Sequence, residues 1–167
     1  MKAVWETRFA LGGLLACLPL GVVGCPDTDS AVFVELSIQN PSLVVESSAL
    51  ATAVSGTFDL RLHLGPRATD PSEVTLGSLS ITNHDQTSTI IAPLAAVPDP
   101  DDPWTVNIDS DVNVHFTIDA VDNEVEVSAV DALCDPNGIL ISGAFDDSLE
   151  DALKSVTSRV FQPSGCP

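Results

Sequence analysis

Apolar and polar residues alternate along most of the chain, and this period of two predicts half-buried antiparallel strands. The clearest segment is residues 56–64, where Phe58, Leu60, Leu62 and Leu64 share one face and polar side chains share the other. Similar alternation marks residues 32–38, 73–82, 87–92, 104–108, 112–118 and 124–128, and residues 139–145 form a compact apolar segment. Within 73–82 the alternation slips at Gly77, which predicts a β-bulge there.

This number of short strands is typical of two packed antiparallel sheets. We therefore predict a mainly β protein whose domain is an antiparallel β-sandwich of about seven to nine strands. The pattern is similar to that of immunoglobulin-like sandwiches, an architectural resemblance that implies no activity.

The pattern changes near the end of the chain. Apolar residues recur there at helical spacing and would form one stripe: Leu149, Ala152, Leu153, Val156 and Val160. Acidic residues precede this stripe as candidate caps, and Pro163 follows it. We expect an amphipathic C-terminal helix over residues 147–161, docked on the core of its own domain.

A different apolar segment, residues 9–24, follows a weakly basic start and ends in Val22-Val23-Gly24-Cys25. A basic start, a short apolar core and small residues at a cleavage site are typical of a secretory signal. The last four residues resemble the bacterial lipobox, and this resemblance implies cleavage after Gly24 and lipidation of Cys25. Ordinary signal-peptide cleavage without lipidation is the alternative. A permanent membrane span is disfavoured, because 16 residues fall short of the roughly 20 that spanning requires.

The resemblance divides the chain into a cleaved signal (residues 1–24), a short acylated tether (25–30) and a single β-sandwich domain (31–167). It implies a lipoprotein of the bacterial cell envelope, facing the periplasm or the exterior, with the lipid bilayer as its partner through acylated Cys25. Because about six residues of tether reach at most roughly 20 Å, we expect the domain to lie close to its membrane. The sequence leaves open whether this is the inner or the outer membrane.

Without residues 1–24 the chain carries 23 acidic and four basic residues. Such a surface repels nucleic acid and anionic lipid headgroups, so we expect no nucleic-acid partner. Cation binding is one interpretation of the acidity, and a solvated surface suited to salty surroundings is the other.

The cysteines support the same division of the chain. Cys17 is removed with the signal and Cys25 carries the lipid, which leaves Cys134 and Cys166. An even pair in an oxidising compartment predicts a structural disulfide.

Catalytic motifs are absent from the sequence, which has no Gly-x-Ser-x-Gly elbow, no His-Glu-x-x-His pair and no phosphate-binding loop. His63 and His115 fall on the polar faces of their strands, and His84 lies in a predicted turn. We expect neither enzymatic activity nor a required cofactor.

One candidate binding region is the loop 93–103, which combines four prolines with Asp99, Asp101 and Asp102 and is followed by Trp104. An exposed Trp104 beside carboxylates would suit stacking on a sugar or a cation. Its register with Val106 instead favours a place in the core.

A second region is the acidic turn at residues 119–124. Its Asp119, Asp122 and Glu124, together with the three loop carboxylates, are candidate calcium ligands. The sequence thus predicts a lipid-anchored domain with a non-catalytic binding or structural role, whose partner is an unknown envelope protein or a glycan. The alternative is a calcium-dependent adhesion or glycan-binding module.

Overall fold

The computed structural model describes Asp29, residues 31–48 and residues 51–166. The lipobox, Cys25 and the tether except Asp29 lie outside these described residues. Within them, the strands are β1 (Glu35–Ser47), β2 (Thr52–Leu64), β3 (Ser72–Asn83), β4 (Thr89–Ile91), β5 (Val97–Pro98), β6 (Thr105–Val106), β7 (Ser110–Ile118), β8 (Glu124–Val125), β9 (Ile139–Asp147) and β10 (Glu150–Thr157). A 3-10 turn, η1 (Val127–Ala129), leads directly into the short helix α1 (Val130–Leu133).

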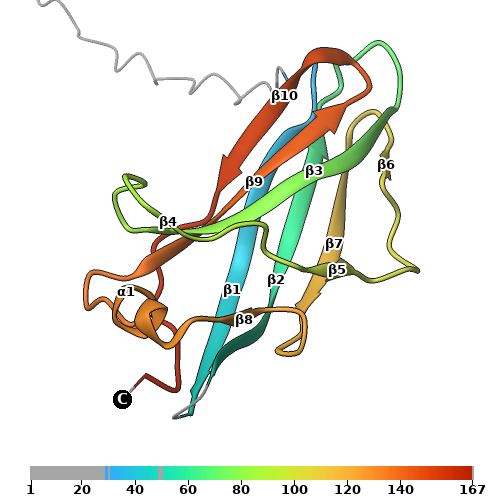
Figure 1. Cartoon of the computed structure of the whole chain (residues 1–167). Helices are drawn as coiled ribbons and strands as arrows, with labels where there is room; N and C mark the ends of the chain where they lie inside the picture. The colour runs from blue at the N-terminus through green and yellow to red at the C-terminus, as the bar shows by residue number, and fades with distance from the viewer. Residues whose placement is uncertain (1–28, 30, 49–50, 167) are drawn as a thin grey trace, which may run out of the picture.

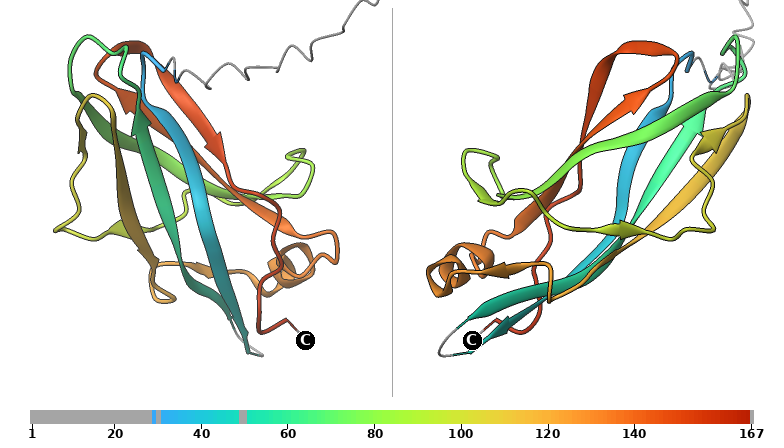
Figure 2. Two further views of the ribbon diagram at one scale, coloured as in Figure 1. Left: turned by 180° about the vertical axis from the view of Figure 1, so that it is seen from behind. Right: turned by 45° about the vertical axis from the view of Figure 1, so that its right-hand side comes forward.

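The strands form two antiparallel sheets. Sheet 1 follows the order β1-β2-β7-β5, with β8 also paired to β2, and sheet 2 follows β10-β9-β3-β4, with β6 also paired to β3. Figures 1 and 2 show β1, β2 and β7 as one layer and β3, β9 and β10 as the other. This arrangement confirms the predicted antiparallel β-sandwich.

The core lies between the sheets and is built from the apolar members of the alternating pattern. Phe58 and Leu62 of β2 are at most 1 % exposed, as are Ile81 of β3 and Phe145 of β9. The Phe58 ring stacks on Phe116 of β7 with the ring centroids 4.6 Å apart. Period-two alternation therefore places one face of each long strand in a shared apolar interior.

The predicted bulge at Gly77 is confirmed. The pairing of β3 with β9 shifts register between Leu76 and Ser78. A Cβ atom on Gly77 would lie 2.9 Å from the carbonyl oxygen of Ala144, so a larger residue would push the two strands apart.

The predicted C-terminal helix over residues 147–161 is wrong. This segment completes β9, turns, and forms the edge strand β10, with Lys154 opposite Phe145 and Val156 opposite Gly143. A register irregularity between Glu150 and Lys154 breaks the alternation, so the apolar residues imitate helical spacing. The supposed stripe does not share one environment, because Val156 is buried whereas Leu153 is 65 % exposed.

The sandwich has two distinct ends. One end, which we call the arm end because residues 31–34 lead into β1 there, is where β2 finishes at Leu64 opposite the start of β7 at Ser110. The β9–β10 turn lies beside the first residues of the domain at this end (Figure 1). At the disulfide end, β1 and β2 meet at Ser47 and Thr52, near α1 and the C-terminal segment (Figure 1).

Candidate functional site: the fastened N-terminal arm

The residues that join the tether to β1 are held by both sheets. We call Asp29 and residues 31–34 the arm. It contacts β2 of sheet 1 through His63 and contacts β9 and β10 of sheet 2 through Asp147 and Lys154. A force applied to the N-terminus would therefore be transmitted to both sheets through the arm.

The first fastening is made by His63. Its Nε2 lies 2.8 Å from Asp29 Oδ2 and its Nδ1 lies 3.0 Å from Asp111 Oδ1. The Arg61 guanidinium lies 2.8 Å from the same Asp111 oxygen. His63 is on the polar face of β2, as the alternation predicts, and it bridges the arm to β7.

These contacts shift the proton affinities of both partners. Partial burial opposes the charging of His63, but hydrogen bonds to Asp29 and Asp111 outweigh it and raise the pKa of His63. The backbone N–H of Ala31, followed by His63, lowers the pKa of Asp29. The pair is thus favoured in its charged form.

Gly65, directly after the end of β2, lies in close contact with the arm. A Cβ atom there would lie 2.7 Å from both the Ala31 carbonyl oxygen and Asp29 Oδ1. Any side chain at this position would have to displace the arm.

The second fastening is centred on Asp147, the last residue of β9, which is 1 % exposed. Its Oδ2 accepts the backbone N–H of Val34 at 2.8 Å, and its Oδ1 accepts the hydroxyl of Ser72 and the backbone N–H of Leu149. Burial disfavours its charge, but these hydrogen bonds and the positive charge of Lys154 outweigh it and lower the pKa of Asp147. A buried carboxylate satisfied in this way fixes the arm to sheet 2.

Lys154 completes this fastening. Its Nζ donates to the Val34 carbonyl at 2.8 Å and lies 2.9 Å from Glu150 Oε2 and 3.5 Å from Asp147 Oδ2. The ammonium also lies 5.2 Å from the centroid of the Phe33 ring, within the range of a cation–π contact. Both polar backbone groups of Val34 are thereby held by one acid–base pair.

The other histidines lie elsewhere on the surface. His115 Nδ1 lies 2.7 Å from Asp59 Oδ1, and Asn40 donates to the other Asp59 oxygen, so this pair sits on the open outer face of sheet 1. His84 is exposed in the turn after β3.

The structure separates the candidate calcium ligands into two groups. Asp99 Oδ1 accepts the N–H of Asp101, and Asp102 Oδ2 accepts the N–H of His115 in the middle of β7. Asp119, Asp122 and Glu124 lie beyond the end of β7, where Asp119 Oδ1 accepts the N–H of Val121. Among the described residues, no three His, Cys, Asp or Glu side chains are placed to hold a metal ion together.

Trp104 lies between the core and the surface. It is partly buried and packs against the apolar cluster, with its ring edge-on to Phe116 at a centroid distance of 5.8 Å. The preceding loop contains β5, whose Val97 is 62 % exposed. This position favours the core interpretation of Trp104 over a free stacking platform.

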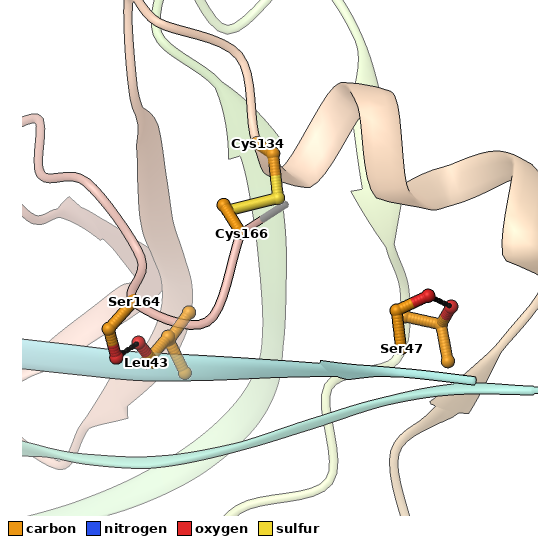
Figure 3. Close-up of a disulfide and its surroundings, with 6 residues drawn as sticks. Leu43, Ser47, Cys134, Ser164 and Cys166 are labelled. Atoms are coloured by element: carbon orange, nitrogen blue, oxygen red, sulfur yellow. Dashed lines mark hydrogen bonds between the residues drawn. A yellow bond between two sulfur atoms is a disulfide. The ribbon is translucent and has the colours of Figure 1, made fainter.

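The predicted disulfide between Cys134 and Cys166 is present and lies next to α1 (Figure 3). The segment before Cys166 runs along β1, where the Ser164 N–H donates to the Leu43 carbonyl and the Val45 N–H donates to the Ser164 carbonyl. The disulfide end is thus closed by a covalent bond, whereas the arm end is closed by ion pairs.

Sequence reasoning missed the fastened arm. Asp147 resembled a helix cap, and Val34 resembled an ordinary strand residue. One usable signal was present: Lys154 is the only lysine after Cys25, and an isolated cation in an acidic chain is a reasonable candidate for a specific ion pair.

No family model, curated protein or solved structure matches this chain. None of the helices in the described part of the chain has the length and apolar character needed to cross a bilayer.

Proposed function

We propose that this protein is a membrane-anchored lipoprotein of the bacterial cell envelope, attached through acylated Cys25, whose β-sandwich has a non-catalytic binding or structural role. The observation that carries the proposal is the fastening of the arm. Among the described residues, the first contact to the sandwich is that of Asp29 with His63, only four residues after the cysteine of the lipobox-like sequence. A domain held at its N-terminus by a short lipid-bearing tether needs such a connection.

The histidines support a non-catalytic role. His63 has both ring nitrogens engaged with carboxylates, so it has no free nitrogen with which to activate a nucleophile. His115 is paired with Asp59 on an open sheet face rather than in a cleft. In the proposed role these histidines join neighbouring strands and do not act on a substrate.

The experiment is to compare the full chain with a Cys25→Ser variant in a bacterial host that processes lipoproteins. The parent should partition with membranes and carry a diacylglyceryl group on its N-terminal peptide by mass spectrometry. The variant should lose that mass and leave the membrane fraction. A parent chain with an unmodified Cys25, or a variant that stays equally membrane-bound, would contradict the proposal.

A further inference from the structure

We propose that the arm end of the sandwich faces the lipid bilayer, with Val32 and Phe33 in contact with the headgroup region, and that the disulfide end points away from it. The inference rests on the proposed lipidation of Cys25, and it adds the orientation in which the domain is held.

The length of the tether restricts where the bilayer can be. Asp29 lies four positions after Cys25, and at no more than about 3.6 Å per residue this stretch reaches roughly 14 Å. Because Asp29 is bound to His63, no further chain is available unless that contact breaks. The acyl chains must therefore enter the membrane close to the arm.

Apolar side chains lie exposed at this end. Val32 is 44 % exposed and Phe33 is 41 % exposed, and both lie in the arm. Ile108 is 39 % exposed and lies just before the start of β7, on the same end of the sandwich. Partial burial of such side chains in the headgroup region is favourable and would support end-on contact.

The charges at this end permit the contact. Of the four basic residues that follow Cys25, Arg61 and Lys154 lie on strands that reach the arm end, and Arg67 lies in the loop that leaves β2 there. Arg67 is exposed, forms no ion pair within the described residues, and is free to bind lipid phosphate. Exposed Asp70 and Asp109 outnumber it, so the tether, and not attraction between net charges, sets the contact.

Lying flat on sheet 1 is the alternative orientation, and its outer face disfavours it. That face carries the Asp59–His115 pair, which would be desolvated against a membrane. An upright domain keeps this pair in water. With β1 spanning 13 residues at about 3.3 Å each, α1 and the disulfide would stand about 40 Å from the bilayer.

Tryptophan fluorescence tests the orientation. The mature lipidated protein, which begins at Cys25 and lacks Trp5, would be reconstituted into phosphatidylcholine vesicles with brominated acyl chains, which quench tryptophan at the membrane. In a Trp104→Phe background, which keeps an aromatic ring against Phe116, Phe33→Trp is compared with Val121→Trp. Val121 is 81 % exposed and lies in the turn after β7, at the disulfide end. The Phe33→Trp emission should shift to the blue and be quenched at least twofold more than that of Val121→Trp.

Equal quenching at both sites, or stronger quenching at Val121→Trp, would overturn the orientation. Co-sedimentation of the same samples separates this failure from failure of the anchor. If the protein sediments with vesicles only when Cys25 is intact, but Phe33→Trp is quenched no more than Val121→Trp, the proposed anchoring stands and the orientation is wrong. If the parent sediments no better than Cys25→Ser, both proposals are wrong. Adding His63→Ala to Phe33→Trp should reduce the difference in quenching, because it frees Asp29.

Discussion

The Asp147 carboxylate accepts a hydrogen bond from the backbone N–H of Val34 at 2.8 Å, although 113 residues separate them in the sequence. Asp147 ends β9 in sheet 2, whereas Val34 directly precedes β1 in sheet 1. One buried side chain therefore joins the two layers at the point where the chain enters the domain.

Replacing Asp147 should be strongly destabilising. Asp147→Asn removes the charge that two backbone N–H groups and Lys154 all face, and we expect the free energy of unfolding to fall by about 2–4 kcal/mol. Urea unfolding of the domain measures this change. Asp146→Asn is the matched control, because Asp146 is its exposed neighbour on β9 and should change stability by less than about 0.5 kcal/mol. Equal effects of the two substitutions would show that the buried contacts contribute nothing.

Acid should remove the same contribution. The pKa of Asp147 is lowered in the fold, so its stabilisation is complete above the unfolded pKa, near 3.9, and is lost as the pH falls through the folded pKa. The Asp147→Asn variant should show a weaker loss of stability in this acidic range than the parent. If the stability of the parent and of Asp147→Asn fell in parallel as the pH was lowered, the assignment of this acid-sensitive contribution to Asp147 would be contradicted.

His63 should respond in the opposite direction. Burial lowers its pKa, but Asp29 and Asp111 outweigh this and raise it; Arg61 pairs with the same Asp111 oxygen. Its stabilisation is therefore complete below the unfolded pKa, near 6.5, and is lost as the pH rises through the folded pKa. Melting temperatures should fall more between pH 6 and pH 8.5 for the parent than for His63→Gln. An NMR titration that gives His63 an ordinary or lowered pKa would refute this.

The sandwich was predictable because its signal is local. Phe58, Leu60 and Leu62 alternate with polar residues, and this pattern fixes which face of β2 is buried whatever its partners are. The Gly77 bulge was visible for the same reason, since the slip occurs within one strand. The Cys134–Cys166 pair was predictable by elimination, because two of the four cysteines had other assignments.

The parts that could not be predicted depend on contacts between distant segments. β10 follows an irregular turn, so Leu153 and Val156 lose the period of two, and only pairing with β9 identifies the segment as a strand. The arm is similar, because nothing near Val34 in the sequence indicates that Asp147 and Lys154 bind its backbone. The carboxylates of residues 99–102 and 119–124 were candidates for neighbouring sites only because their places were unknown: the first group lies beside the middle of β7 and the second beyond its end.

Calcium should not bind specifically to the carboxylates of residues 99–102 and 119–124. Asp99, Asp102 and Asp119 already accept backbone N–H groups, and the two groups lie apart. We expect the melting temperature to rise with ionic strength, because salt screens repulsion among the acidic residues, and to be the same in calcium and sodium chloride of equal ionic strength. A rise with micromolar calcium that EDTA reverses would contradict this expectation.

One substitution should make the protein more stable. Thr82 is 8 % exposed, and its hydroxyl has no hydrogen-bond partner among the described residues, so it carries a desolvation cost without compensation. Thr82→Val keeps the β-branched shape, and we expect it to raise the free energy of unfolding by about 0.5–1 kcal/mol. Thr52→Val is the matched control, because Thr52 is 0 % exposed and its hydroxyl lies 3.3 Å from Ser47 Oγ. The control should be neutral or destabilising, and a Thr82→Val variant that loses as much stability as Thr52→Val would show that the Thr82 hydroxyl is satisfied in solution.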